Sequence, residues 1–399
     1  MIDLTLNELQ RKQRAFQDAF MEAQLFLEEE KPLPEIKEGE LWKKILANLN
    51  YYIDYSLEYN DNIYLFKDKT SDIIHRIFPG LRTNLRDPKL NLNFDFSFGT
   101  NVYSRYSRHT GYESNFDFNL NRSLGYYNFM FHNSFETTKL APVRFGVTQE
   151  EFPRYLNDFF HLRLSRAFNR LNFNLGYWQS YWDYESEYGS RNDNIQYNFY
   201  LGGDFRIAPK TFFLTETQWG FTRYRNRAYS NRDSDSHEFN FGLKGLLTHK
   251  LTGIVKLGYR YQDYKTFSDY KDAVLSGALD YQFSKLTQFN FNFERTTHES
   301  TYREQDYYIN HEFSLSMVHR WAFNPRIYTK LNFDFSYQDF PKRFGISRHD
   351  QLWGESFGLG YKMHRWFTFE FSYAHKERES NVDYDYTNNI FIFRTYVLF

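Results

Sequence analysis

The chain of 399 residues contains no cysteine and only 9 prolines and 20 glycines. The absence of cysteine excludes a disulfide framework and any metal site built on thiolates. No apolar stretch reaches the roughly 20 residues of a membrane-spanning helix, which excludes a helical membrane protein. An excess of one charge is also lacking, since 49 Lys and Arg balance 50 Asp and Glu to a net charge of −1. The composition therefore predicts no nucleic-acid partner.

Aromatic residues are abundant, with 44 Phe, 34 Tyr and 7 Trp. Disordered chains are poor in aromatic residues, so this content predicts a folded protein. The mean hydropathy is nevertheless polar, at −0.72. A β-barrel that crosses a membrane combines both properties, because apolar and polar residues alternate along its strands and cancel in the average.

Alternation of apolar and polar residues begins near Leu49 and continues to the C-terminus. The clearest example is the segment 90–98, which reads LNLNFDFSF. The same pattern returns in the segments 116–120, 171–177, 195–201, 239–243, 255–259, 289–293, 331–337, 367–373 and 391–399. A period of two predicts strands with one apolar and one polar face.

The predicted connections alternate between short and long. Segments 121–123 and 167–170 are short, whereas 137–156, 184–192 and 339–350 are long. Short turns on one side and long loops on the other are typical of outer-membrane barrels. A soluble propeller or β-solenoid is the alternative, but the chain shows no repeated motif beyond the alternation itself.

The sequence therefore predicts an all-β fold, a transmembrane antiparallel up-and-down β-barrel over residues 49–399. At about 20 residues per strand and connection, this length accommodates about 18 strands. Strands near 71–82 and 211–221 have the weakest alternation, which leaves 16 strands as the alternative.

Residues 1–48 form a separate N-terminal segment with a helical pattern. Over 6–30 the apolar residues recur at helical spacing, and they include Leu9, Phe16, Phe20 and Leu27. The stretch 41–47 predicts one or two further turns. An even strand number places both ends of the barrel on the periplasmic side, so we expect a periplasmic N-terminal segment.

The apolar stripe of the predicted helix over 6–30 has to be buried, because an isolated amphipathic helix gains most of its stability from packing. We expect Leu9, Phe16, Phe20 and Leu27 to dock onto a periplasmic protein partner or a second copy of the chain. A plug inside the lumen is the alternative.

Two segments are similar to known families. The terminal segment 388–399, NNIFIFRTYVLF, resembles the last strand of bacterial outer-membrane proteins. This resemblance implies that Phe399 is a signal to the barrel-assembly machinery, and that the barrel lies in outer-membrane lipid and lipopolysaccharide. The segment 57–65, LEYNDNIYL, followed by DII at 72–74 and FPGL at 78–81, resembles the first hairpin of β-barrel porins associated with exopolysaccharide export.

If the Phe-rich face meets lipid, the alternation places the polar residues in the lumen. The charged residues expected there are Asp54, Glu58, Asp95, Asp117, Lys244, Lys256, Arg260, Asp280, Glu294, Glu312, Asp334 and Glu370. One interpretation is a hydrated wall whose charges pair across strands. The other is a passage lined by amides and carboxylates for cations or neutral sugars.

Catalytic and metal-binding motifs are missing from the sequence, which contains neither HExxH nor GxSxG. We therefore predict no enzymatic activity, no metal and no cofactor. Most of the Tyr and Trp residues near strand ends are interpreted as members of the aromatic girdle at the membrane interface. They include those in 177–184 and Tyr224, Tyr259, Tyr261, Tyr264, Tyr337 and Tyr373. Stacking of carbohydrate on aromatic residues of the loops is the alternative for some of them.

These features together predict an outer-membrane channel, either porin-like or a conduit for polysaccharide export. The alternative is a structural anchor whose N-terminal helix docks a periplasmic complex.

Overall fold

The computed structural model describes residues 38–87, 89–139, 154–185, 190–226, 232–266, 268–300, 307–343 and 346–399. These ranges contain an α-helix, α2 (Glu38–Ala47), a short 3-10 helix, η1 (Ser107–His109), and 18 strands. The first nine strands are β1 (Asn50–Asn60), β2 (Asp72–Asp87), β3 (Leu90–Tyr103), β4 (Gly111–Leu124), β5 (Tyr127–Lys139), β6 (Arg154–Phe168), β7 (Leu171–Tyr184), β8 (Asn194–Ala208) and β9 (Thr211–Tyr224). The others are β10 (Ser234–Leu246), β11 (Leu251–Tyr264), β12 (Tyr270–Gln282), β13 (Thr287–Glu299), β14 (Tyr307–Trp321), β15 (Asn324–Arg343), β16 (Ile346–His364), β17 (Phe367–Ser380) and β18 (Tyr386–Leu398).

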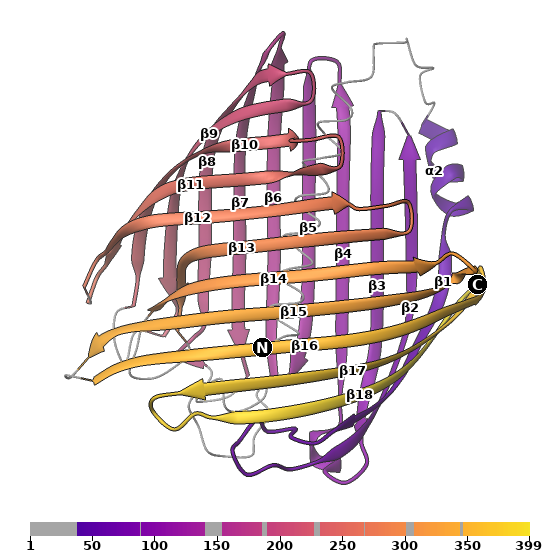
Figure 1. The fold of residues 1–399 in the computed structure, drawn as a ribbon. Coiled ribbons are helices and arrows are strands. Elements are labelled where there is room, and N and C mark those ends of the chain that lie inside the picture. Colours follow the sequence, from indigo (N-terminus) through magenta and orange to yellow (C-terminus); the bar gives the residue numbers. More distant parts are fainter. Residues whose placement is uncertain are drawn as a thin grey trace.

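The strands form one closed antiparallel barrel (Figure 1). Each strand pairs with its neighbours in sequence, and β1 pairs with both β2 and β18. Closure leaves no strand edge with unpaired N–H and C=O groups. The predicted 18-stranded barrel is confirmed, and the alternative of 16 strands is wrong because 72–82 and 211–221 lie within β2 and β9.

Connections at the two ends of the barrel differ in length (Figure 1). The end that holds α2 and the C-terminus has tight turns, such as 125–126, 169–170 and 209–210. At the opposite end, β1 and β2 are joined by the longer loop 61–71.

Two predicted connections are wrong. Residues 121–123 lie within β4, and the turn follows at 125–126, where Gly125 has a φ of 67°. The expected long loop over 339–350 is mostly strand, because the ladder between β15 and β16 continues to the pair Arg343 and Ile346. Its polar residues lie at the end of two long strands, where they resemble a loop in sequence.

The outer face of the barrel is apolar. Large side chains such as Phe98, Leu175 and Phe239 are about half exposed on it, at 50%, 57% and 53%. The neighbouring residues of the same strands point inward and include buried polar groups such as Ser97, Asn174 and Asn240. An apolar exterior of this extent is stable only against lipid, whose acyl chains need no hydrogen bonds.

Two inward-facing glycines allow tyrosine rings to lie flat against the wall. A Cβ atom at Gly176 would be 2.0 Å from the ring of Tyr200 on the paired strand, and one at Gly360 would be 2.0 Å from the ring of Tyr328. An aromatic ring that covers a cross-strand glycine is a known stabilising arrangement in sheets. The rings therefore line the wall rather than projecting across the lumen.

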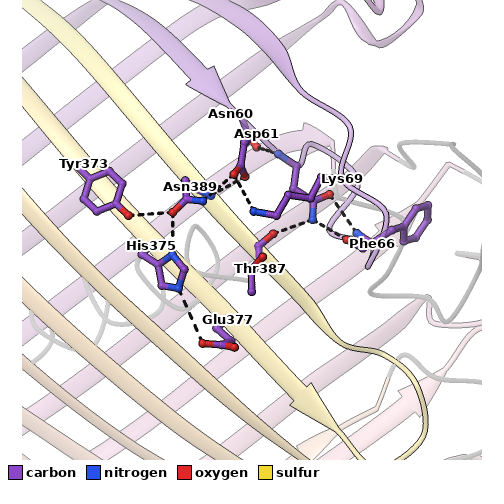
Figure 2. Close-up of polar contacts among 10 residues, drawn as sticks. Asn60, Asp61, Phe66, Lys69, Tyr373, His375, Glu377, Thr387 and Asn389 are labelled. Atoms are coloured by element: carbon purple, nitrogen blue, oxygen red, sulfur yellow. Dashed lines mark hydrogen bonds and ion pairs between the residues drawn. The ribbon is translucent and has the colours of Figure 1, made fainter.

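A polar network joins the first loop to the last strand at the long-loop end (Figure 2). The Asp61 carboxylate accepts hydrogen bonds from the backbone N–H and the side-chain Nδ2 of Asn389, both at 2.7 Å, and pairs with Lys69 Nζ at 2.8 Å. Asn389 Oδ1 in turn lies 2.9 Å from the Tyr373 hydroxyl and 2.8 Å from His375 Nδ1. We call Asp61 and Asn389 the closure latch.

Asn62 adds a second connection across the same seam. Its Nδ2 donates to the carbonyl of Phe66 at 2.6 Å and to that of Thr387 on β18 at 2.8 Å. Partial burial would raise the pKa of Asp61, but the hydrogen bonds from Lys69 and Asn389 outweigh it and lower that pKa. The ionised latch is thus the stable form at neutral pH.

Helix α2 lies beside β2 at the short-turn end (Figure 1). The Thr83 hydroxyl of β2 lies 3.5 Å from the carbonyl of Ile45, and Lys44 Nζ lies 3.5 Å from the Asp87 carboxylate. This helix confirms the predicted turns over 41–47. In the described part of the chain, no helix has the length and apolarity needed to cross a membrane.

Candidate functional site

The cavities of the lumen include three of about 680, 380 and 480 Å³ within the described structure. The largest of these three cavities lies against β5–β18, and the cavity of about 480 Å³ lies against β1–β5 and β14–β18. Their linings include eight of the twelve charged residues expected in the lumen, namely Glu58, Lys244, Lys256, Arg260, Glu294, Glu312, Asp334 and Glu370.

A group of ion pairs lies on the inner face of β8–β11. Lys244 Nζ lies 2.6 Å from the Asp204 carboxylate, and Lys256 Nζ lies 2.9 Å from that of Glu216. Each of these pairs spans two strands, because the four-carbon stem of lysine reaches past the strand between them. Arg260 pairs with Glu238 directly across the β10–β11 ladder, at 3.8 Å.

The Asp204 carboxylate is the best-connected group in this region. Besides Lys244, it accepts hydrogen bonds from Asn172 Nδ2 at 3.2 Å and Asn174 Nδ2 at 2.8 Å. Its side chain is only 6% exposed. This buried carboxylate therefore has three hydrogen-bond donors, and charge-assisted hydrogen bonds are stronger than neutral ones.

A second group of ion pairs lies where the barrel closes. Glu58 pairs with Arg76 at 3.0 Å, Asp54 with Arg394, and Glu370 with Lys330 at 2.7 Å. The Glu370 carboxylate also accepts a hydrogen bond from the Tyr328 hydroxyl at 2.8 Å. The structure thus gives basic partners to expected lumen residues on β1 and β17.

The remaining expected lumen residues have mixed environments. Asp95 accepts a hydrogen bond from the Tyr52 hydroxyl at 2.6 Å and lies 3.8 Å from Arg82 Nε. Asp117 lies 3.3 Å from His132 Nε2, and Asp280 accepts a hydrogen bond from the Asn290 amide.

Several charged residues of the lumen were not among those expected from the sequence. Glu216 belongs to β9, where Thr215 and Thr217 interrupt the apolar face and made the alternation weak. Asp350 and Arg348 lie 2.7 Å apart in a buried cluster with Arg378, in a segment that resembled a loop. Arg394 and Lys330, in contrast, occupy inward positions that the alternation of their strands identifies.

The interpretation of the aromatic residues in 177–184 needs correction. Trp178, Trp182 and Tyr184 line the largest cavity instead of facing the membrane interface. Tyr224 lines the same cavity, and Tyr264 is buried in a cluster with Tyr270 and Tyr307. The cause is the alternation itself, because even-numbered residues of β7, β9 and β11 point inward whatever their type.

The described residues contain no group of three His, Cys, Asp or Glu side chains that could hold a metal ion. The described side chains that line the lumen supply paired charges, amides, hydroxyls and aromatic faces.

The family described as "Putative beta-barrel porin 2" matches residues 50–395. This range begins at the first residue of β1 and ends within β18, so it includes residues of all 18 strands.

The chain belongs to this family.

The protein is thus an outer-membrane β-barrel porin, and its lumen is that of a porin-like channel. The prediction of a structural anchor as the main role is not favoured.

Among solved structures, the porin is similar to Pseudomonas aeruginosa OpdK crystallised with vanillate, at 8% identity and a TM-score of 0.48. That match covers 88% of this chain and 99% of OpdK. It is also similar to Pseudomonas aeruginosa OpdQ, at 10% identity and a TM-score of 0.47, with 89% and 99% of the two chains covered. No curated protein sequence matches the porin.

Two other predicted sites lie at the ends of the chain. Phe399 is 69% exposed, and its backbone N–H donates to the carbonyl of Tyr51 at 2.7 Å, which holds the C-terminus against β1. The expected docking residues Leu9, Phe16, Phe20 and Leu27 lie outside the described residues.

Proposed function

We propose that the porin conducts hydrophilic solutes through its lumen, and that the twelve expected lumen residues and their partners form the wall of the passage. The observation that carries this proposal is the contrast between an apolar exterior and an inner face with paired charges and amides. A solute in such a lumen exchanges water for protein hydrogen-bonding groups, which lowers the cost of passage. Export of a polysaccharide remains one form of this proposal.

The orientation follows from the two ends of the barrel. Outer-membrane barrels have short periplasmic turns and longer extracellular loops. The short turns, α2 and Phe399 would then lie in the periplasm, and the loop 61–71 with the closure latch would face the exterior.

Ion pairing in the lumen supports only weak selectivity for cations. The twelve expected lumen residues comprise nine acidic and three basic ones, but Arg76, Lys330 and Arg394 pair with three of the acidic groups. The remaining preference for cations should decrease at high salt, because mobile ions screen the wall charges.

Conductance of the purified porin in a planar bilayer tests the proposal directly. We expect ohmic single channels and a reversal potential of the cation-selective sign in a KCl gradient. Absence of conductance, both in the full chain and in a variant lacking residues 1–37, would contradict it. Clear anion preference would contradict the charge assignment alone.

We propose further that the N-terminal segment is periplasmic and that Leu9, Phe16, Phe20 and Leu27 dock onto a periplasmic protein or a second copy of the chain. Deletion of residues 1–37 should leave a heat-modifiable barrel with unchanged conductance but without the bound partner. A large rise in conductance on deletion would instead support a plug.

The C-terminal residue and the outer face have proposed roles in assembly and in contact with the membrane. Phe399 would be recognised by the barrel-assembly machinery, and the outer face would contact lipid and lipopolysaccharide. Replacing Phe399 by Ala should lower the fraction of assembled barrel in cells, whereas the same change at the exposed turn residue Phe323 should not. We assign no enzymatic activity, since the lumen groups described above are all suited to binding.

A further inference from the structure

Helix α2 packs on the outer side of the barrel wall. The Thr83 hydroxyl of β2 lies 3.5 Å from the carbonyl of Ile45, and the Asp87 carboxylate lies 3.5 Å from Lys44 Nζ. Thr83 is paired with Phe94, which belongs to the apolar face of β3, and Asp87 lies four residues further along the same face of β2. Both contacts of α2 are therefore made with the lipid-facing side of β2.

The wall next to α2 is buried, although it belongs to the apolar outer face. Thr83, Leu85 and Leu90 are 4%, 6% and 9% exposed, whereas Phe96 and Phe98, further from the turn on the same face, are 37% and 50% exposed. Helix α2 contacts this end of β2, close to the short turn between β2 and β3. It thus lies at the end of the membrane-facing band, where lipid headgroups are expected to meet the barrel.

A second face of α2 is apolar and exposed. Trp42 and Leu46 are each 66% exposed, and their spacing of four residues places them side by side on the helix. Lys43 and Lys44 beside them are also exposed. Trp and Leu on one face with Lys next to them are typical of helices in the membrane interface, where the indole body contacts acyl chains and its N–H contacts water.

The turns at this end of the barrel are basic. Of the eight short turns that the described strands define, six contain Lys or Arg and none contains Asp or Glu. Lys89 lies in the turn after β2, and Arg122 of β4 is paired with the covered residue Leu90; both basic side chains are exposed. We call Lys43, Lys89 and Arg122 the basic collar.

Apolar and cationic side chains on one surface favour a ligand that has both an acyl chain and a negative charge. Lys and Arg bind phosphate oxygens by charge-assisted hydrogen bonds, and an anionic membrane surface attracts basic residues close to it. A symmetric contact with a second copy of the chain would bring two basic collars together, which like-charge repulsion disfavours. The charge therefore favours lipid over a second copy as the occupant of this surface.

We propose that α2 is an interfacial membrane helix with Trp42 and Leu46 among the acyl chains, and that the basic collar binds headgroups of acidic phospholipids in the same leaflet. In the proposed orientation this is the periplasmic leaflet. The inference concerns the outer surface of the barrel and does not depend on conduction through the lumen.

The absence of cysteine allows a single fluorescent label to be placed on α2 in the full chain. The L46C variant, labelled with bimane, is reconstituted into vesicles of equal amounts of phosphatidylcholine and phosphatidylglycerol. Both leaflets have the same composition, so the direction of insertion does not matter. We expect lipid with a doxyl group on its acyl chain to quench the label and aqueous iodide to have little effect. A label at D68C, in the exposed part of the loop 61–71, should show the reverse.

The same label measures the preference of the collar for acidic lipid. At low salt, doxyl-phosphatidylglycerol should quench it about twofold or more as strongly as doxyl-phosphatidylcholine, and the difference should decrease at high salt. The K43Q/K89Q/R122Q variant should lose this preference. The control K210Q/K250Q/K285Q removes three charges from turns between β8 and β13 and should keep it. Heat modifiability verifies that both variants form the barrel.

Three results would overturn the inference. Quenching of L46C by iodide as strong as that of D68C would mean that this face of α2 lies in water. Protection of the L46C label from both quenchers would mean that protein covers the helix. Equal quenching by the two lipids, or a preference unchanged in K43Q/K89Q/R122Q, would contradict the assignment of the basic collar to acidic headgroups.

Discussion

The outer and inner faces of a single strand differ in the kind of contacts that their side chains make. On β17 the outward residues Phe367, Phe369 and Phe371 alternate with the inward residues Thr368, Glu370 and Ser372. Phe369 contacts other aromatic rings, with centroids 4.4 Å away at Phe367 and 6.0 Å away at Phe393. Glu370 has specific partners in Tyr328 and Lys330.

This difference shows what each face requires. The outer face needs apolar character, and one large apolar residue can replace another because lipid adapts to its shape. On the inner face, each charged group depends on partners located one or two strands away. The stability of the barrel should therefore depend on how apolar each residue of the outer face is. On the inner face it should depend on the particular partners of each charged residue.

The largest expected effect comes from a charge on the outer face. Replacement of Phe369 by Arg should destabilise the barrel by about 2–4 kcal/mol, because the guanidinium would meet hydrocarbon. Replacement of Glu370 by Gln should cost less than about 1 kcal/mol, since Lys330 is 41% exposed to the lumen. Reversible urea unfolding in lipid vesicles measures both values, and equal costs would remove the basis for assigning the faces.

The closure latch is a polar exception on the outer face. Replacement of Asp61 by Ala should destabilise the barrel by about 1–3 kcal/mol, because it leaves the donors of Asn389 and Lys69 without their acceptor. The matched control is Asp68→Ala, an exposed residue of the same loop. Hydrogen exchange should rise selectively in β1 and β18, and similar exchange in both variants would show that the latch is unimportant.

Ion pairs of the inner face should affect permeation more than stability. Replacement of Glu216 by Gln leaves Lys256 with a weaker partner and removes one negative charge from the wall, which makes the net charge of the wall more positive by one. The reversal potential in a KCl gradient should move by a few millivolts in the anion-selective direction, and the shift should disappear at high salt. An unchanged reversal potential would place Glu216 outside the ion pathway.

The smallest expected effect is confined to the loop between β7 and β8. Burial raises the pKa of Asp193 to about 6, although the backbone N–H of Tyr184 donates to its carboxylate at 2.8 Å. Because the pKa of Asp193 is higher in the folded state than its unfolded value near 4, the folded loop becomes less stable as the pH rises from about 4 to about 6. Hydrogen exchange of this loop should be slower at pH 4.5 than at pH 7 after correction for intrinsic rates, and D193N should remove the difference.

Much of the fold could be predicted because a barrel strand repeats every two residues. The alternation in 90–98 or 367–373 identifies both the strand and its lipid-facing side. Prediction was weakest where polar residues occur on the outer face. Thr215 and Thr217 obscured β9, and His349 and Gln351 made part of β16 resemble a loop.

The candidate site could be predicted less well, for a physical reason. Parity shows that Trp178 and Trp182 are even-numbered residues of an alternating strand, but their type suggested the membrane interface. Their position in the lumen follows from their parity, because they lie on the same face of β7 as Asn172 and Asn174. The position of a residue in the alternation therefore predicts whether its side chain faces the lumen or the membrane better than the residue type does.

The sequence by itself determined the two faces and most of the strand pattern, because both follow from local side-chain direction, but it left 16 or 18 strands possible. Only the tertiary structure decided which groups meet. Asp204 and Lys244 are 40 residues apart and interact across an intervening strand, and Asp61 and Asn389 are 328 residues apart and meet because the barrel closes. Such contacts depend on the register of the strand ladders and on closure of the barrel, and the alternation of apolar and polar residues along a strand does not specify either.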